Sequence, residues 1–408
     1  MIEDNYFVWE KLANSGALGQ DAPQILQHML VAWESYADLY ASALNKLGYD
    51  ATRVVPSANV RKTTESLHRL GHLVRQIPTS GRSAIDQSLC FASNILKDLK
   101  EHEYQLFHFL TVYSRFMASS TPLLSLLRPV ICQYSGGEPP ASNRTLASMA
   151  SKVSLEIALR RCSAVLIDEG IGPELAHQVK SMIQYFRVPR SKIFDFPVVC
   201  VDSSAFIPIA KSEARNALGF PTDKVILLCP TSIPKPPVPG LAKNPFLLVD
   251  TISKLSRQAR DGMRLYVAGH GAGFAELKTM VRTSGLEDTV KLLGLIDHRR
   301  LPTYFGASDA VFLPYLCRDL TIGTTVAEAY SSERPALAFR RDAMVSARQP
   351  GGFLISSEPT EGALELAEFM PSLPTFKIGL EAKSLAHRYS LTSVARRLDD
   401  IYRTVLNV

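Results

Sequence analysis

The sequence predicts an α/β fold built from two parallel-sheet domains, and three observations carry this prediction. Short apolar runs of strand length alternate with longer segments whose apolar residues recur at helical spacing. This alternation is typical of a mostly parallel sheet covered by helices on both faces. The chain has 408 residues, which suits two domains of ~100–200 residues each. Residues 192–208 contain two prolines and no helical period, so we place the passage between the domains there.

The first domain is expected over residues 1–200. A helix from Gln24 is expected to end before Gly48, a residue suited to a helix C-cap. A polar segment with leucines at 67, 70 and 73 predicts another helix. The remaining expected elements are strands at 6–9, 51–55, 104–110, 129–133 and 164–167, a glycine-containing loop at 13–19, and helices at 84–99, up to 161 and from 172.

The second domain is expected over residues 201–387 and repeats the same alternation. Its expected strands are 224–229, 263–268, 290–293, 310–313 and 336–339, and its expected helices are 245–255 and 274–283. Residues 234–240 form a proline-rich loop that is too stiff for a helix. The chain ends in a helix over 388–408, whose apolar residues are Leu391, Val394, Leu398, Ile401, Tyr402 and Val405.

The stretch 309–339 is the first place to look for chemistry. A buried strand leads through a polar loop into a helix that opens near 321–323 and carries one acid, Glu328. A helix N-terminus offers unpaired N–H groups and a partial positive charge, which suit an anion. Glu328 can accept hydrogen bonds from a neighbouring diol such as a ribose. The alternative is an ordinary strand–helix–strand unit with a solvated glutamate.

Composition narrows the classes of partner. The net charge of +6 and pI of about 8.9 suit anionic small molecules or an anionic membrane surface and argue against nucleic acid. Basic spots such as 298–300 are interpreted as solvated faces. Six cysteines lie far apart without CxxC spacing, which favours reduced residues in a cytoplasmic protein. We find no signal peptide and no apolar run of the ~18 residues that span a bilayer.

Several segments resemble, in order, the C-terminal domain of the GT-B glycosyltransferases, specifically the retaining family 4. They are VDSSAFIP at 201–208, LYVAGHG at 265–271, VKLLG at 290–294, ASDAVFLP at 307–314 and the terminal YSLTSVARRLDDIYRTV. The resemblance implies a GT-B fold, in which two Rossmann-like domains face each other across a cleft. In this family the last helix crosses back onto the N-terminal domain.

The resemblance also implies a reaction. Family members move a sugar from a nucleotide diphosphate sugar, with retention and without a cofactor or bound metal, to an acceptor that is a small molecule, a glycan or a lipid-linked molecule. The protein itself must then neutralise the departing diphosphate with backbone N–H groups, a helix dipole and a Lys or Arg. A peripheral membrane contact stays open, and no oligomeric state is implied.

The family's donor-site positions are partly matched. Glu328 fits the second of two acids, which implies that it holds the donor ribose, and Lys243 fits the lysine that faces the diphosphate. Gly323 fits the loop glycine beside the phosphate, with Thr324 and Thr325 next to it. The first acid would stand at Leu320, so Asp319 is the candidate to replace it.

Other positions depart from the family pattern. Ser232 stands near the expected arginine, and Lys235 either supplies the missing charge or is solvated. His270 is a donor-site candidate or a turn residue. Glu333 stands where a glycine is usual.

Three candidates fall in the first domain. Ser135 takes the place of the family's sugar-contacting histidine, and Gly16, or Gly19, fits the loop that meets the phosphate. His108 fits a second strand-end histidine, and its alternative is a core histidine between two phenylalanines.

Two functions follow from these matches and departures. The first is a retaining glycosyltransferase. The second is a catalytically degenerate, glycosyltransferase-like nucleotide-binding or partner subunit, and a sugar-nucleotide epimerase of GT-B fold explains the segments less well.

Overall fold

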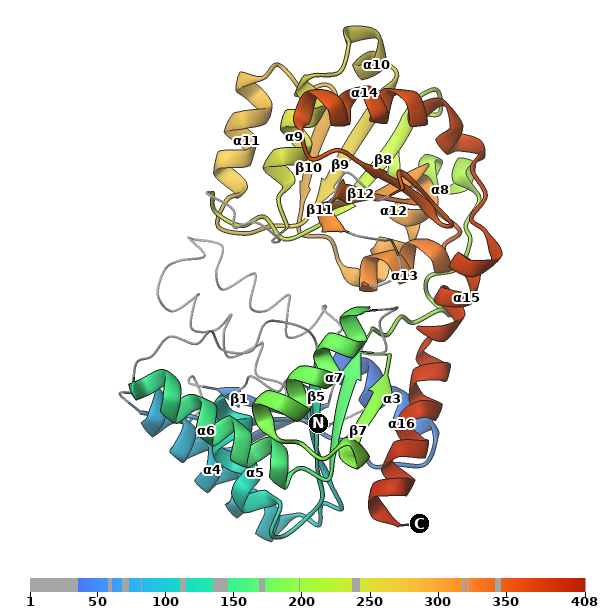
Figure 1. The fold of residues 1–408 in the computed structure, drawn as a ribbon. Coiled ribbons are helices and arrows are strands. Elements are labelled where there is room, and N and C mark those ends of the chain that lie inside the picture. Colours follow the sequence, from blue (N-terminus) through green and yellow to red (C-terminus); the bar gives the residue numbers. More distant parts are fainter. Residues whose placement is uncertain are drawn as a thin grey trace. The chain divides into compact units, whose positions relative to one another are not determined.

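The computed structural model describes residues 36–407, except 58–60, 68–72, 82, 111–114, 135–145, 169–172, 198, 237–242, 318–319, 321–322 and 342–345. The chain divides into two compact units, shown in Figure 1. The first unit runs up to residue 200 and takes up residues 391–408, and the second comprises Val201–Ser390.

The first unit is a sheet covered by helices on both faces. Its strands pair in the orders β1-β3-β2 and β4-β5-β6-β7, and all the pairs are parallel except β2 with β3. The strands are β1 (Arg53–Ser57), β2 (Thr64–Leu67), β3 (Leu73–Pro78), β4 (Phe107–Phe109), β5 (Val130–Tyr134), β6 (Ala164–Asp168) and β7 (Ile193–Phe196). The helices are α3 (Tyr36–Lys46), α4 (Ala84–Glu101), α5 (Arg115–Leu124), α6 (Leu146–Arg161), α7 (Pro173–Phe186) and α16 (Leu391–Leu406).

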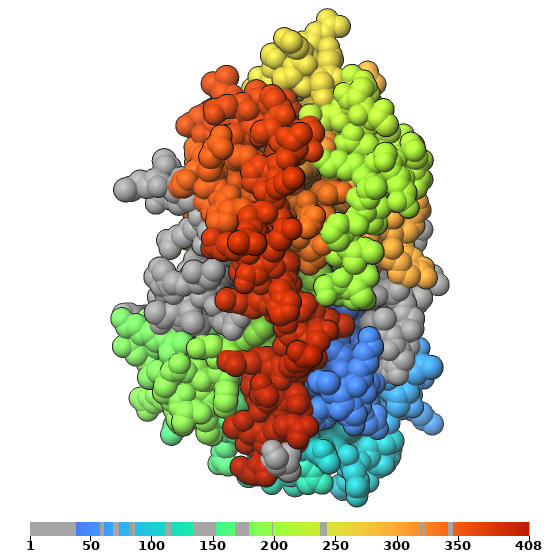
Figure 2. Space-filling view, turned by 90° about the vertical axis from the view of Figure 1, so that its right-hand side faces the viewer, coloured from blue at the N-terminus to red at the C-terminus, as the bar shows by residue number. Residues whose placement is uncertain are grey.

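The last helix, α16, belongs to the core of this unit. Its predicted apolar stripe is confirmed, because Leu391, Val394, Leu398, Ile401 and Tyr402 are all buried. They join α3 residues and strand residues such as Ile131 and Leu166 in one cluster. Figure 2 shows the red α16 lying against the blue α3. On the other face α4, α5 and α6 lie side by side over a second cluster (Figure 1).

One expectation for this unit was wrong. The segment around Leu67 and Leu73 is not a helix but the antiparallel pair β2–β3. In β3, Val74 and Ile77 are buried, and the buried Arg75 donates a hydrogen bond to Glu65 of β2. The stretch 192–208 was expected as the passage between the domains, and the boundary between the two units, after Cys200, falls within it. Its first part also forms a strand, because β7 pairs with β6. The strand at 6–9 and the loop at 13–19 lie outside the described residues.

The second unit is a seven-stranded sheet in the order β10-β9-β8-β11-β12-β14-β13, in which only β13 is antiparallel. The strands are β8 (Val225–Pro230), β9 (Met263–Ala268), β10 (Val290–Gly294), β11 (Ala310–Cys317), β12 (Ala336–Arg340), β13 (Arg348–Gln349) and β14 (Gly352–Ile355). The helices are α8 (Lys211–Leu218), α9 (Pro245–Ser253), α10 (Arg257–Asp261), α11 (Phe274–Thr283), α12 (Leu301–Ala307), α13 (Thr324–Ser331), α14 (Pro359–Phe369) and α15 (Leu380–Arg388). All five expected strands are confirmed, and so are the helices expected at 245–255 and 274–283.

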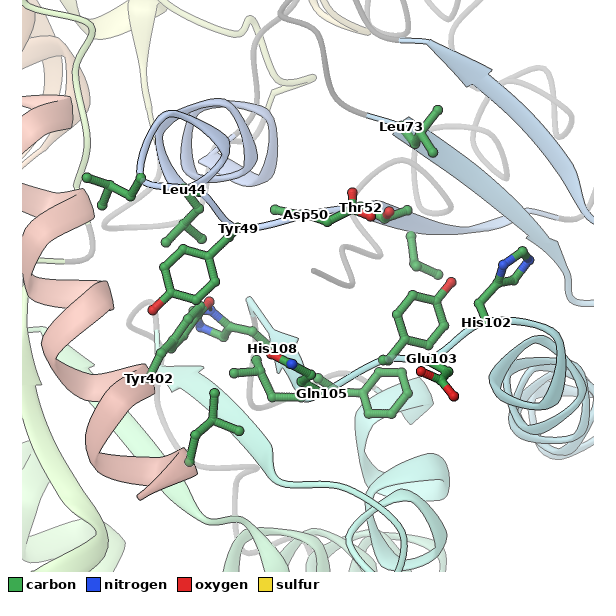
Figure 3. Close-up of a pocket in the computed structure, with 18 of the residues that line it drawn as sticks. Leu44, Tyr49, Asp50, Thr52, Leu73, His102, Glu103, Gln105, His108 and Tyr402 are labelled. Atoms are coloured by element: carbon green, nitrogen blue, oxygen red, sulfur yellow. Dashed lines mark hydrogen bonds between the residues drawn. The ribbon is translucent and has the colours of Figure 1, made fainter. Parts of the chain in front are cut away.

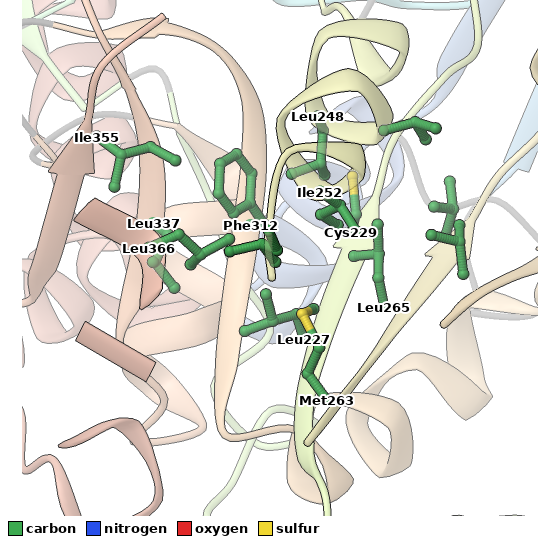
Figure 4. Close-up of a cluster of buried hydrophobic side chains, with 14 of the residues drawn as sticks. Leu227, Cys229, Leu248, Ile252, Met263, Leu265, Phe312, Leu337, Ile355 and Leu366 are labelled. Atoms are coloured by element: carbon green, nitrogen blue, oxygen red, sulfur yellow. The ribbon is translucent and has the colours of Figure 1, made fainter. Parts of the chain in front are cut away.

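The core of this unit sits between the sheet and its helices. Figure 4 shows strand residues such as Leu227, Phe312 and Leu337 meeting Leu248 of α9 and Leu366 of α14. β8 is the centre of the topology, because the chain moves from β8 to β9 on one side and returns to β11 on the other. In open α/β sheets, ligands bind at the carboxyl ends of the strands beside such a switch point.

Candidate functional site

Helix α13 begins at the carboxyl end of β11, next to the switch point. Gly323 precedes it with φ +131, a conformation that favours glycine. A Cβ at this position would lie 3.2 Å from the hydroxyl oxygen of Tyr315. Thr324 and Thr325 form the first turn and are partly exposed. Their amide groups and the helix dipole suit an anion.

Glu328 lies one turn further along α13 and is only 6% exposed. Its Oε1 is 3.4 Å from Nε2 of His298, at the start of the 3-10 helix η3 (His298–Arg300). The expectation that residues 298–300 form a solvated face is wrong for His298, whose side chain is only 16% exposed. A long-range contact of this kind leaves no local signal in the sequence.

Lys243 lies within electrostatic reach of the same carboxylate. It precedes α9, and the N–H of the following residue, Asn244, donates to the carbonyl of Pro314 in β11 at 2.5 Å. Lys243 is exposed to solvent, yet partial desolvation by the surrounding protein lowers the pKa of its ammonium group. Electrostatic interactions with Cys229 and Glu328 act in the opposite direction and raise this pKa. The fold thus brings Lys243, which is distant in sequence, within electrostatic reach of a carboxylate on α13.

Leu320 occupies the position expected for the first acid of the family pattern. Its side chain is buried, and its carbonyl oxygen accepts a hydrogen bond of 2.8 Å from Tyr330 in α13. This bond ties the loop before α13 to the helix itself. Asp319, the candidate replacement for the first acid, lies outside the described residues.

The loops after β8 and β9 pack directly on each other. The amide of Ile233 donates to the carbonyl of His270, and the amide of Gly273 donates to the carbonyl of Ile233. Cβ atoms at Gly269, Gly271 and Gly273 would lie 1.7, 2.3 and 2.1 Å from carbonyl oxygens of the β8 loop. The three glycines therefore allow close backbone packing between the two loops.

The candidates on these loops occupy different surroundings. Ser232 and Lys235 are exposed on the β8 loop. The His270 ring stacks on Phe274 of α11 with its centroid 4.7 Å away, which suits a turn residue and still leaves it at the carboxyl edge of the sheet. Glu333, where a glycine is usual, has φ +53 and pairs with Lys383 at 2.7 Å.

His108 lies in the core of the first unit. It is 1% exposed, its Nδ1 is 2.8 Å from the hydroxyl oxygen of Tyr402, and its ring stacks with Tyr40. Burial lowers the pKa of His108 to about 3, so the ring is neutral. These surroundings favour the structural alternative. Ser135 and Gly16 lie outside the described residues.

A pocket of about 850 Å³ opens beside His108 at the starts of β1, β3 and β4. Thr52, Leu73, Gln105 and Tyr402 line it in Figure 3. These positions mark the amino ends of the strands, opposite the edge where parallel sheets bind their ligands. The pocket therefore does not lie at the edge of this sheet where a ligand is expected.

Within the described part of the chain, no group of three or more His, Cys, Asp or Glu side chains is placed to hold a metal ion. None of the helices that the structure describes is long and apolar enough to cross a membrane.

Part of the chain is similar to a known protein family. Residues 211–366 match the family described as "Glycosyl transferases group 1". D-inositol 3-phosphate glycosyltransferase 2 of Catenulispora acidiphila is 26% identical over 215 residues, which cover 50% of this chain and 48% of the relative. Alpha-D-kanosaminyltransferase of Streptomyces kanamyceticus is 23% identical over 38% of this chain and 41% of its own length. The chain thus spans about half the length of these curated relatives, or less.

Solved structures share the fold of nearly the whole chain. Sucrose-phosphate synthase from Thermosynechococcus elongatus has a TM-score of 0.70 at 15% identity, covering 91% of this chain and 93% of its own. Anabaena HepE, solved in complex with UDP-glucose, has a TM-score of 0.64 at 17% identity, covering 91% of this chain and 97% of its own. The chain therefore has a GT-B fold of two Rossmann-like domains, and its residues 211–366 are similar to the group 1 glycosyl transferase family.

Proposed function

We propose that this protein is a glycosyltransferase that moves a sugar from a nucleotide diphosphate sugar to an acceptor, with retention and without a metal ion. The observation that carries the proposal is the grouping of Lys243, Glu328 and the N-terminus of α13 at the carboxyl edge of one sheet. The match to the group 1 family and the UDP-glucose complex of a structural relative support a nucleotide-sugar donor.

Each group has a role in this proposal. The amides at Gly323–Thr325 and the ammonium of Lys243 meet the diphosphate, and Glu328 accepts hydrogen bonds from the ribose. Catalysis then consists of positioning the reactants and stabilising the leaving group. In a front-face displacement the leaving phosphate oxygen accepts the proton of the acceptor, so the neutral, buried His108 is not needed as a base.

The acceptor is proposed to be a small molecule, a glycan or a lipid-linked molecule, and a lipid-linked one would require a peripheral membrane contact. The N-terminal loops expected to meet it, at 13–19 and 135–138, lie outside the described residues. The six cysteines are all described and form no disulfide, which supports a reducing, cytoplasmic location.

Substituting Glu328 or Lys243 tests the donor site. Glu328→Gln and Lys243→Met are each expected to weaken nucleoside diphosphate binding roughly tenfold, because each removes one charged hydrogen-bond partner. Transfer is measured with a panel of UDP-, GDP- and ADP-sugars, binding by calorimetry, and the anomeric configuration of the product by NMR. Glu333→Gln is the matched control, since Glu333 is an exposed carboxylate just beyond the same helix. Unchanged binding in both site variants would contradict the proposal.

The second candidate function is a degenerate nucleotide-binding or partner subunit. The observation that favours it is the buried Leu320 at the position of an expected acid. Tight nucleoside diphosphate binding without hydrolysis or transfer for any donor in the panel would select this alternative.

Nucleoside diphosphate binding is expected to weaken as the pH rises, and to do so at a lower pH than the one at which an ordinary lysine loses its charge. Crowding lowers the pKa of Lys243, so its positive charge is lost as the pH rises through a value below the usual ~10.4. Lys243→Arg should move this loss to higher pH, because arginine stays protonated. The dissociation constant of one nucleotide is measured with both proteins from about pH 7 to about pH 10. Because the ligand is the same, its own ionisation affects both proteins equally and drops out of the comparison. If the dissociation constants of the wild type and of Lys243→Arg change with pH in the same way, a group other than Lys243 governs the pH dependence of binding.

A further inference from the structure

The side chain of His298 contacts the carboxylate of Glu328. Its Nε2 lies 3.4 Å from Oε1 of Glu328, and the two side chains are only 16% and 8% exposed. η3 follows β10 and precedes α12, so His298 reaches α13 from a different element. Nothing in the local sequence pairs these two residues.

The His298 ring also packs against an aromatic side chain. Phe206 packs edge-on against it at a centroid distance of 5.6 Å, and Phe206 packs in turn on Phe305 of α12 at 5.3 Å. Asp297 caps η3 by accepting a 3.0 Å hydrogen bond from the amide of Arg299. The imidazole is therefore positioned by packing and by backbone geometry before any ligand arrives.

This arrangement leaves one side of the Glu328 carboxylate for a ligand. The described residues place His298 at Oε1 and no donor at Oε2. A carboxylate has about four lone-pair sites, so one oxygen can be anchored while the other accepts from hydroxyl groups. Burying a carboxylate without all of its hydrogen bonds costs free energy, which favours a ligand that completes them.

We propose that His298 is a positioning residue for the donor: it anchors Oε1 of Glu328 so that Oε2 is presented to the ribose diol. The inference rests on the proposed function, because it assumes that a nucleotide occupies this edge. His298 itself does not touch the ligand. It acts by restricting the carboxylate to one orientation, which lowers the entropy lost on binding.

Two substitutions distinguish the contact between His298 and Glu328 from the packing of His298 against Phe206. His298→Leu keeps an apolar side chain against Phe206 and removes the contact with Glu328. His298→Gln places an amide N–H close to the position of Nε2 and is expected to rescue binding. Each protein is titrated with UDP, GDP and ADP and with their 2′,3′-dideoxy forms, and its folding is checked by thermal unfolding.

The expected result is a coupling between His298 and the ribose hydroxyls. His298→Leu should weaken binding of the ribonucleotide roughly tenfold and leave binding of the dideoxy form nearly unchanged. In transfer assays the donor KM should rise more than kcat falls. Equal losses for both nucleotide forms, or no loss for either, would overturn the role of His298 alone. A wild-type protein that binds none of the three nucleotides would overturn the proposed function as well.

Discussion

Asp309→Ala is expected to lower the free energy of unfolding by about 3–5 kcal/mol, because it leaves a buried positive charge without its partner. Asp309 is 2% exposed and follows α12. Its Oδ2 accepts from Arg215 at 2.6 Å and from the amide of Ile226 at 2.8 Å, and its Oδ1 accepts from Lys211 at 2.7 Å. The carboxylate thus joins α8, β8 and the start of β11 in one network.

Chemical denaturation monitored by circular dichroism measures this effect. Lys211→Met serves as the control and should cost less than Asp309→Ala, because the Lys211 side chain is 29% exposed and its pairing is screened by solvent. The double variant Asp309→Ala with Arg215→Leu should recover part of the loss, since it removes both buried charges. A loss below about 1 kcal/mol for Asp309→Ala would mean that water reaches Arg215 in its place.

Gly271→Ala is expected to cost about 1–3 kcal/mol of stability and to weaken nucleoside diphosphate binding at least about tenfold. A Cβ at this position would lie 2.3 Å from the carbonyl oxygen of Ile233, so the β8 and β9 loops must separate. The separation would break the hydrogen bond from Ile233 to His270. It would also displace the loop that carries Ser232, beside the proposed diphosphate site.

Gly262→Ala is the matched control. Its added Cβ would approach backbone oxygens no closer than 3.5 Å, an ordinary contact, so both stability and binding should stay near wild type. Thermal unfolding and nucleotide titration of the two variants measure the difference. If Gly271→Ala binds nucleotide as the wild type does, the packing of the two loops has no part in the site.

The elements that the sequence predicts best are those with a strong local pattern. β9 and α11 occupy the expected residues because an apolar run and an amphipathic segment are each bounded by turn residues. The β2–β3 hairpin was mistaken for a helix because leucines at 67, 70 and 73 mimic helical spacing. Its true partner is an adjacent strand, and strand pairing leaves a weaker local signal than a helix does.

Some residues of the candidate site could be identified from the sequence, and others only from the packing of the elements. Glu328 was identified from its own segment, and Lys243 and Gly323 from the resemblance to the family, whereas His298 was taken for part of a solvated face. The pairing of His298 with Glu328 depends on where η3 packs, and that position is set by contacts with Phe206. The place of Leu320 is likewise a tertiary result, because its burial and its bond from Tyr330 depend on the packing of α13.

By itself the sequence determined the α/β class, the parallel sheets and the apolar stripe of the last helix, because burial imposes a period on each segment. Only the tertiary structure decided which polar side chains meet at the carboxyl edge, and which histidine lies in the core. The physical reason is that hydrophobic periodicity is a property of neighbours in the chain. Hydrogen bonds, ion pairs and close backbone contacts join residues that are distant in sequence, so they are settled only when the elements pack.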